Sequence, residues 1–565
     1  MNSEILGITA LFMLTLLLAI PLGRYCVKVF KNEKSWLDFM SPLENAVFKL
    51  CRINPDLAMD WKENLKASLT LNLIFFLWAF LILTTQSWHP FWNPDGITSM
   101  EPTTAFNTAV SFMTNTNLQH YSGESGATYM TQLLVFCFLQ FVSAATGIAA
   151  MTSVFKAMAY GQTTDLGNFY QLFLKSCTRI LLPLSIVIAI FLIVRGIPST
   201  FDGASQIITL QGDTVNVARG PVAPMVAIKQ IGTNGGGYFG PNSTHPFENA
   251  DYLTNFVENF AILIIPMALI FAFGFYIGKP KAGYAFFAAM TLVFLTFVFV
   301  TVHFESQGNP EITRMGIDNS LGSMEGKEVR FGPVASAYWG VSTTSTSNGS
   351  VNSMHDSQTP ISGGIYILDM MINAIYGGVG VGFINFFVFV IIAVFISGLM
   401  VGRTPELFGK KIEAKEVKIA ALVAILHPFL ILVSTAIAAH LQANNPDIGW
   451  LANPSYHGFS EMLYEFTSAA ANNGSGFEGL GDATAFWNIL CGICMLFGRF
   501  IPIIGPLAIA GSLAAKKYVP ESAGTLKVES PAFVAVLLSV IIIIAALSFF
   551  PALALGPIAE YFSIL

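Results

Sequence analysis

The sequence IKQIGTNGGG occupies residues 228–237, and its centre, Thr233-Asn234-Gly235, is the most informative pattern for predicting the architecture. Similar sequences centred on Asn recur along the chain at spacings of 117, 114 and 125 residues. The four copies are Asn115-Thr116-Asn117, Thr233-Asn234-Gly235, Ser347-Asn348-Gly349 and Asn472-Asn473-Gly474. Each copy follows a short stretch compatible with a helix and lies between long apolar runs. The pattern predicts four repeats of one unit, in the order membrane helix, pore helix, polar loop, membrane helix.

Composition places these repeats in a membrane. Hydrophobic residues make up 54% of the chain and charged residues only 11%, and the mean hydropathy is +0.62, whereas charged residues are about a quarter of a soluble protein. A span needs about 20 apolar residues. The candidate spans are 4–30, 65–86, 128–156, 172–196, 254–278, 282–303, 366–402, 416–441, 484–514 and 530–556.

We therefore expect an all-α membrane protein in which four repeats form a pseudo-fourfold, potassium-channel-like arrangement within a single transmembrane domain. One extra helix precedes the repeats (4–30) and one follows them (530–556). The four repeats are assigned to residues 65–156, 172–278, 282–402 and 416–514.

The basic residues predict the orientation. Five segments hold 22 of the 28 Lys and Arg residues: 24–66, 156–179, 279–281, 403–418 and 499–529. They alternate along the chain with the polar loops, so the positive-inside rule places them in the cytoplasm and the N-terminus outside. The outer segments then carry 20 Asp and Glu against 6 Lys and Arg. Such an acidic surface concentrates cations near the pore, although it could also serve only to keep the outer loops soluble.

The chemistry of the polar loops fits K⁺. Thr, Ser and Asn supply neutral backbone and side-chain oxygens, which suit a weakly hydrated monovalent cation. The loop centres lack the carboxylates that a divalent cation prefers. Gly235, Gly349 and Gly474 allow backbone conformations that are costly for residues with a Cβ atom. Asn-Gly is also a common turn dipeptide, but its recurrence in register favours the ring. Asn117 is followed by Leu118, so we expect the ring to be asymmetric.

Two further features predict a barrier below the ring. The run 366–402 is longer than one span needs, and four glycines in its middle, Gly377, Gly378, Gly380 and Gly382, should break the helix. A broken helix at membrane depth is tolerated where it lines a cavity or is buried in protein, so we expect a gating loop; close helix packing is the alternative. Arg499 lies in an apolar run, where an Arg is costly and usually functional. The alternative for Arg499 is a side chain that reaches the inner interface.

The chain lacks nucleotide motifs. No GxxxxGK[ST] sequence and no Asp-Lys-Thr-Gly phosphorylation sequence occurs. We therefore expect no catalytic site and no nucleotide on this chain. Energy for pumping would have to come from a partner.

Six strings carry a resemblance to a known family. They are VSFMTNTNLQHYSGE (110–124), IKQIGTNGGGYFGPNSTHPFENA (228–250), MEGKEVRFGPV (324–334), STSNGSVNSMHDS (345–357), GLMVGRTPELFGKKI (398–412) and SAAANNGSGFEGL (468–480). In order and over essentially the whole chain, they closely resemble the potassium-binding subunit (KdpA) family of the bacterial potassium-transporting ATPase. The resemblance implies a multi-pass protein of the bacterial plasma membrane that captures external K⁺ at Thr116, Thr233, Ser347 and Asn472 and the residues that follow them.

The resemblance also implies partners: a P-type ATPase catalytic subunit, a single-span subunit with a periplasmic domain, and a very short membrane subunit. A nucleic-acid partner is not expected. In the family, Arg499 and the glycine run match residues beneath the filter. Many relatives carry a Glu where this chain has Asn373, so the residues that would pass the ion sideways are left open. Two alternatives remain: a stand-alone ion-coupled transporter or channel of the same superfamily, and a scaffold that does not transport.

Overall fold

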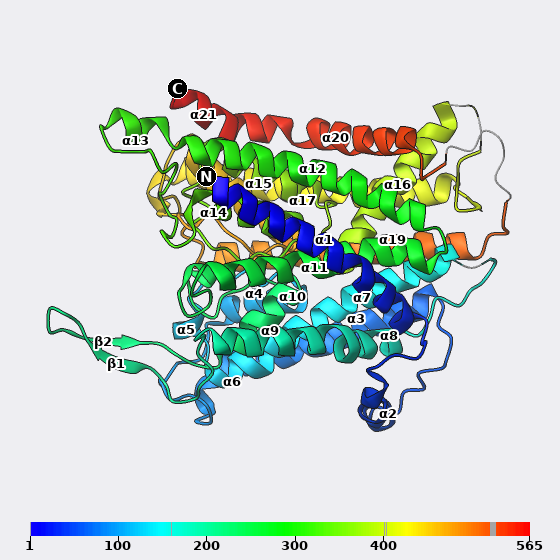
Figure 1. Cartoon of the computed structure of the whole chain (residues 1–565), viewed down its shortest axis with the longest axis horizontal. Helices are drawn as coiled ribbons and strands as arrows, with labels where there is room; N and C mark the ends of the chain where they lie inside the picture. The colour runs from blue at the N-terminus through cyan, green and yellow to red at the C-terminus, as the bar shows by residue number, and fades with distance from the viewer. Residues whose placement is uncertain (1, 160, 401, 403, 520–526) are drawn as a thin grey trace.

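Long helices dominate the computed structural model, which describes residues 2–159, 161–400, 402, 404–519 and 527–565. In this part of the chain, ten helical segments are long and apolar enough to cross a membrane, which confirms the multi-span prediction. The long helices run side by side along the molecule (Figure 1). They are α1 (Asn2–Phe30), α3 (Trp61–Thr85), α7 (Phe138–Ala159), α8 (Phe169–Ser176) continued by α9 (Leu182–Val194), α11 (Tyr252–Tyr276), α12 (Pro280–Gln307), α16 (Val381–Met400), α17 (Ala414–Asn444), α19 (Ala485–Ala514) and α20 (Pro531–Leu553).

Local sequence explains where several of these helices begin. The Asp60 side chain accepts a hydrogen bond from the Glu63 amide at the start of α3, and Asp251 accepts from the Thr254 amide at the start of α11. Such caps satisfy amide groups that have no partner inside the helix. Proline occupies the first turn of α12 and α20, where its missing N–H costs nothing.

Four shorter helices each end just before one of the polar sequences. They are α4 (Pro102–Met113), α10 (Val222–Ile231), α14 (Gly332–Ser345) and α18 (Tyr456–Ala471). All residues of α14 are buried, although the helix contains many Ser and Thr residues. The segments that follow these helices are called polar loops 1 to 4 below (115–117, 233–235, 347–349 and 472–474).

The candidate span 366–402 is two helices rather than one. α15 (Pro360–Ile372) ends at Asn373, whose backbone is left-handed with φ 47°, and α16 begins at Val381. Gly377, Gly378 and Gly380 lie in the break, whereas Gly382 belongs to the first turn of α16. The predicted break is therefore present, but only α16 is long enough to cross the membrane.

The remaining elements are short. A hairpin of β1 (Ser205–Ile208) and β2 (Thr214–Val217) pairs Ser205 with Val217 and projects from one end of the molecule (Figure 1), a feature the sequence analysis missed. Other strands and helices are β3 (Glu406–Leu407), β4 (Lys410–Lys411), α2 (Ser41–Leu50), α5 (Gly123–Gly126), α6 (Tyr129–Thr131), α13 (Pro310–Arg314) and α21 (Ala559–Ser563). Wider π-turns occur at Gln132–Cys137, Cys177–Leu181 and Ala554–Ile558, and 3₁₀ turns at Asp38–Met40, Gln86–Trp88, Asn242–Thr244 and Pro446–Ile448.

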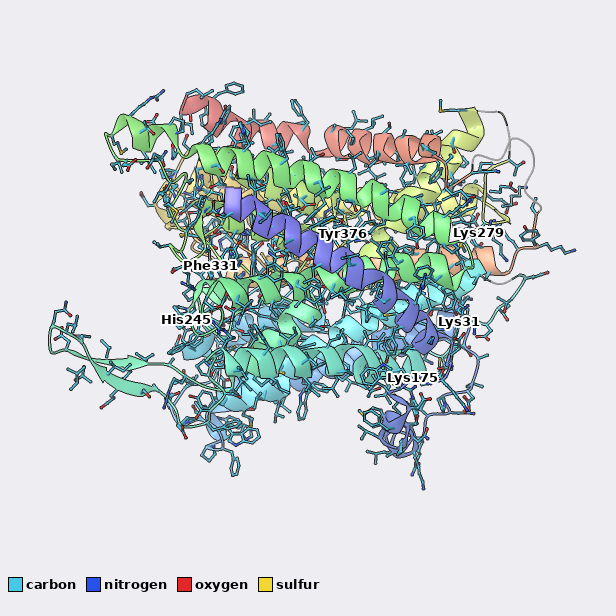
Figure 2. The ribbon with its side chains drawn as sticks, in the orientation of Figure 1. Lys31, Lys175, His245, Lys279, Phe331 and Tyr376 are labelled. Carbon is cyan, nitrogen blue, oxygen red and sulfur yellow. The ribbon has the colours of Figure 1, made fainter. Side chains whose placement is uncertain are left out.

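The two ends of the molecule differ in charge. Figure 2 shows Lys31, Lys175 and Lys279 at one end of the long helices and His245 and Phe331 toward the other. The basic segments 403–418 and 499–529 are described except for Arg403 and residues 520–526, which lie outside the described residues.

Apolar side chains such as Leu6 and Leu17 of α1 are largely exposed, as expected for helices that face lipid.

Candidate ion-binding site

Asn side chains join the four polar loops into a closed ring. Hydrogen bonds that cross between repeats link each loop either to a neighbouring loop or to the short helix before it. The bonds run from Asn115 Nδ2 to Thr233 O (2.7 Å), from Asn348 Nδ2 to Lys229 O (3.0 Å), from Asn473 Nδ2 to Thr343 O (2.8 Å) and from Asn472 Nδ2 to Thr116 Oγ1 (2.9 Å). Lys229 and Thr343 belong to the short helices before loops 2 and 3. Loop 1 thus contacts loops 2 and 4, and the second and fourth repeats each contact the third.

The backbone follows one course in all four loops. The first residue of each loop is left-handed: φ is 65° at Asn115, 46° at Thr233, 49° at Ser347 and 53° at Asn472. The third residue is left-handed as well, with φ of 55° at Asn117, 67° at Gly235, 88° at Gly349 and 99° at Gly474. When left- and right-handed residues alternate, successive peptide groups point toward the same side of the backbone. In a β-strand they point to opposite sides.

This course sets the register between the loops. Asn115, not Thr116, occupies the place that Thr233 has in loop 2, because both are left-handed and the next amide bonds back five residues. Thr116 N donates to Ser111 O and Asn234 N donates to Lys229 O, each at 2.9 Å. Loop 1 is therefore displaced by one residue from the family match that aligns Thr116 with Thr233.

In loops 2, 3 and 4, glycine is required at the third position for steric reasons. A Cβ on Gly235 would overlap the carbonyl oxygen of Asn348, and a Cβ on Gly349 would overlap that of Asn473. Gly474 is packed in the same way against Thr116 O. In loop 1 the equivalent residue is Asn117, one of the few residue types with a Cβ that adopts a left-handed backbone readily. The asymmetry predicted for the ring therefore lies at Asn117 itself, and Leu118 follows it.

The ring is buried, neutral and rich in oxygen atoms. Eleven of its twelve residues are buried, Gly474 is partly buried, and none carries a charge. Asn117 Oδ1 and Asn234 Oδ1 are buried, and no donor among the described residues bonds either oxygen. Buried oxygens without donors are costly unless water or a cation supplies the missing interaction. The oxygen atoms of the ring therefore suit a weakly hydrated monovalent cation.

The broken helix lies against the ring. Gly377 N donates to Ser345 O (2.8 Å), and Val379 N donates to Thr233 Oγ1 (2.9 Å). On its other side the segment touches α7, since a Cβ on Gly380 would overlap the backbone of Gly147. Gly377, Gly378 and Gly380, three of the four predicted gating glycines, thus have loops 2 and 3 on one side and α7 on the other.

Arg499 lies in the middle of α19 and is 3% exposed. Its Nη2 donates to Ser143 O (3.0 Å), and Ser143 Oγ donates to Asn115 Oδ1 (2.8 Å). Among the described residues, no carboxylate pairs with its guanidinium group. The alternative of a side chain at the inner helix end does not fit this position, because α19 continues for fifteen residues beyond Arg499.

Asn373 and Asp369 lie beside loop 3. Ser347 Oγ donates to Asn373 Oδ1 (3.2 Å), and Asn385 Nδ2 donates to Asn373 O (3.2 Å). Asp369 Oδ2 accepts from Thr344 Oγ1 (2.8 Å) and Ser345 Oγ (2.6 Å) at the end of α14. An apolar pocket between α16, α17 and α20 begins at Asn373 and Asn385.

Two buried ion pairs behind the ring were not predicted from the sequence. Lys229 of α10 pairs with Glu248, and both side chains are fully buried. Lys327 pairs with Glu305 of α12 at 2.9 Å, again fully buried. For Lys229, the signal available in the sequence was a single charge in a mostly apolar helix, since a buried charge needs a partner. Lys327 lies outside the helices. The acid that pairs with each Lys could not be chosen from sequence alone.

Comparisons with known proteins show the family to which this chain belongs. A family model described as "Potassium-transporting ATPase A subunit" matches residues 9–562. A protein of Flavobacterium psychrophilum is 58% identical over the full length of both chains, and one of Bacteroides fragilis is 56% identical, again over both full lengths. A protein of Geobacillus kaustophilus is 46% identical over 98% of each chain. All three are named potassium-transporting ATPase potassium-binding subunit. The chain therefore belongs to the potassium-transporting ATPase A subunit (KdpA) family.

Proposed function

We propose that this chain binds external K⁺ in the ring of polar loops and delivers it to a partner P-type ATPase for ATP-driven uptake. The observation that carries the proposal is the closed ring itself, in which four equivalent loops present neutral oxygens without a carboxylate. Such oxygens replace the hydration shell of K⁺. The four repeats, 65–156, 172–278, 282–402 and 416–514, each contribute one loop.

The energy source lies on another chain. This sequence has neither a phosphate-binding loop nor a P-type phosphorylation motif, and the relatives are named as one subunit of an ATPase. The chain supplies no catalytic site in this proposal. Its partners are the ATPase subunit, a single-span subunit with a periplasmic domain and a very short membrane subunit, all in the bacterial plasma membrane.

The barrier below the ring consists of the glycine segment and Arg499. The segment hydrogen-bonds Thr233 of loop 2 and Ser345 at the end of α14. Arg499 adds a positive charge that no described carboxylate neutralises, and it is linked to loop 1 through Ser143. A cation that leaves the ring meets both before it reaches the basic end of the molecule. Asn373 and the pocket next to it offer a sideways route toward a partner. The basic end faces the cytoplasm and the N-terminus faces outward.

Equilibrium binding tests the ring directly. The purified complex is expected to bind ⁸⁶Rb⁺ or K⁺ at one site, and Gly235→Ala is expected to weaken that binding by at least about tenfold because the new Cβ overlaps Asn348 O. Unchanged affinity in a folded Gly235→Ala complex would show that the loops are not the binding site.

Two other functions make different predictions. A stand-alone transporter would move K⁺ into liposomes without ATP or a partner. A scaffold would leave K⁺ affinity of the complex unchanged when ring residues are substituted.

A further inference from the structure

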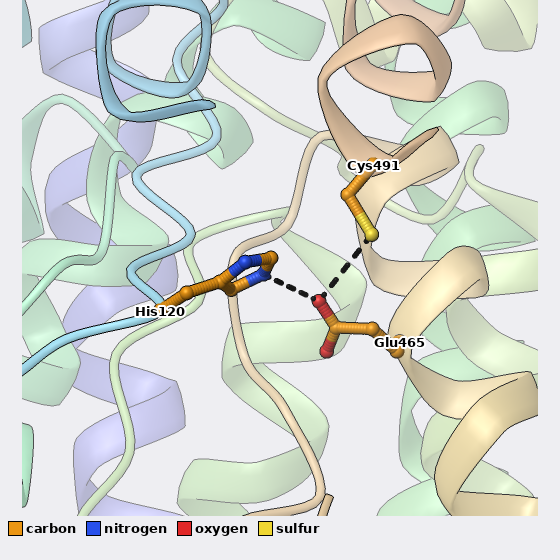
Figure 3. Close-up of side chains that lie close together, drawn as sticks. All are labelled: His120, Glu465 and Cys491. Carbon is orange, nitrogen blue, oxygen red and sulfur yellow. Dashed lines mark hydrogen bonds and ion pairs between the residues drawn. The ribbon is translucent and has the colours of Figure 1, made fainter. Parts of the chain in front are cut away.

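A histidine is enclosed by acidic and polar side chains next to loop 1. His120 lies three residues after Asn117, and its ring is buried. His120 Nε2 is 3.1 Å from Glu465 Oε1 and 3.9 Å from Asp482 Oδ2. Cys491 Sγ lies 3.7 Å from the same Glu465 oxygen (Figure 3). Glu465 belongs to α18, Asp482 follows loop 4, and Cys491 belongs to α19, so three parts of the fourth repeat surround this residue of the first.

Neighbouring hydrogen bonds determine which ring nitrogens carry hydrogen. Thr103 Oγ1 donates to Glu101 Oε2 (2.5 Å), so it has no hydrogen left for Asn488. It must instead accept from Asn488 Nδ2, which is 3.1 Å away. Asn488 Oδ1 therefore faces His120 Nδ1, at 2.7 Å, and can only accept. Nδ1 carries a hydrogen.

The second nitrogen also faces acceptors. An ionised carboxylate only accepts hydrogen bonds, so Nε2 donates to Glu465 as long as Glu465 is ionised. His120 is then an imidazolium with both N–H groups satisfied. Burial alone would lower the pKa of His120, but the nearby Asp482 and Glu465 carboxylates and the Asn488 bond outweigh burial and raise it to about 9.

This contact ties together two adjacent quarters of the ring. At the ring, Asn472 Nδ2 of loop 4 donates to Thr116 Oγ1 of loop 1. Seven residues earlier along α18, Glu465 bonds His120, which lies just beyond loop 1. At the same junction, a Cβ atom on Gly474 would meet Thr116 O and Leu118 N. This junction contains Asn117, the one left-handed third position that is not glycine.

We propose that His120 is a positioning residue: its imidazolium, held between Glu465 and Asn488, fixes the junction of loops 1 and 4 and thereby sets the affinity and selectivity of the ring. The inference rests on the proposed function of the ring. It predicts a role in ion binding for a residue that does not itself contact the ion.

K⁺-stimulated ATPase activity of the whole complex tests the inference. In His120→Gln the new side chain can still form hydrogen bonds but carries no charge. The buried Glu465 therefore loses its positively charged partner. We expect KM for K⁺ to rise about tenfold, the size of one lost bond between charged groups. We also expect kcat to change less than about twofold and the preference for K⁺ over Rb⁺ to fall. His120→Gln combined with Glu465→Gln should recover part of the affinity, because no unpaired carboxylate remains.

The pH profile separates this role from a merely structural one. In the native complex, KM for K⁺ should rise as the pH passes about 9, where His120 loses its proton, and this rise should be missing in His120→Gln. His457→Gln is the matched control, because His457 also bridges two carboxylates, Asp356 and Glu560, but lies away from this junction. It should keep both the native KM and the alkaline rise.

A second variant covers the case in which His120→Gln does not assemble. Asp482 lies at the edge of the cluster, with a side chain 28% exposed. Asp482→Asn removes one carboxylate that favours the imidazolium, so the rise of KM should move to lower pH. A rise of KM at the native pH in Asp482→Asn would overturn the inference. So would a native KM and Rb⁺ preference in His120→Gln when Gly235→Ala weakens binding. In either case the proposed function of the ring would stand. If Gly235→Ala also has no effect, the proposed function fails instead.

Discussion

At the scale of single residues, Gly349 combines a conformational and a steric requirement. Its φ of 88° is strained for a residue with a Cβ atom, and that atom would overlap Asn473 O of the next loop. Gly349→Ala should therefore displace the loop and raise KM for K⁺ by about tenfold or more in uptake assays with cells that lack other K⁺ uptake systems. Gly449→Ala is the matched control, because Gly449 has φ 75° but a new Cβ there would have no atom of the described residues within 4 Å. Equal effects of the two variants would show that strain alone, and not the ring contact, is responsible.

Arg499 is the second residue whose role can be isolated. At an effective dielectric of about 20, a charge at about 4 Å repels K⁺ by about 4 kcal/mol. Arg499→Ala should lower coupled uptake and admit a passive K⁺ leak, measured as flux into proteoliposomes without ATP. Arg499→Lys retains the charge and should leak less than Arg499→Ala. If both variants pump at the native rate without a leak, the electrostatic barrier lies elsewhere.

At the scale of elements, the break between α15 and α16 depends on three close backbone contacts. Gly377 packs against Gly382, Gly380 packs against Gly147, and Val379 N bonds Thr233 Oγ1. Deletion of Gly378 should pull this segment away from loop 2 and give a larger leak than Arg499→Ala in the same proteoliposome assay. A shortened segment that still prevents leakage would mean that this element is not the gate.

The C-terminal helices are docked by a histidine at the start of α18. His457 Nδ1 bonds Glu560 and Nε2 bonds Asp356, each at 2.8 Å. Burial opposes the charge, but the two carboxylates raise the pKa of His457 to about 10. Because the folded-state pKa is raised, this contribution to stability is fully present below the unfolded pKa of about 6.5 and is lost as the pH rises through about 10.

His457→Gln should accordingly lower the free energy of unfolding by about 1–3 kcal/mol at pH 7. The difference from the native protein should shrink above pH 10. Thermal unfolding in detergent at pH 7, 9 and 10.5 measures both effects. A difference that stays constant over this range would show that the charge of His457 contributes nothing.

At the scale of the whole molecule, the ring and the missing nucleotide motifs predict dependence on a partner. Affinity purification from native membranes should recover a P-type ATPase with this chain, and the chain alone should show no ATPase activity. K⁺ flux into liposomes should require both the partner and ATP. Robust uptake by the chain alone would support the stand-alone transporter instead.

Features that depend on local physics could be predicted from the amino-acid sequence. The membrane spans follow from the length of each apolar run, and the break before α16 follows from the helix cost of clustered glycines. The polar loops were found because the Asn-centred pattern repeats. The hairpin at Ser205–Val217 was missed because its strands are short and exposed, so burial leaves little pattern in their sequence.

Features that join distant segments could be read only from the folded chain. It placed Asn115 rather than Thr116 in register with Thr233, because backbone conformation and contacts across the ring fix the alignment of loop 1. It brought His120 to Glu465, 345 residues away in the sequence, and it selected Glu248 as the partner of Lys229. Many carboxylates along the chain could have neutralised either cation. The choice follows from how the helices pack, because a buried charge pairs with whichever acid the fold brings within hydrogen-bond distance.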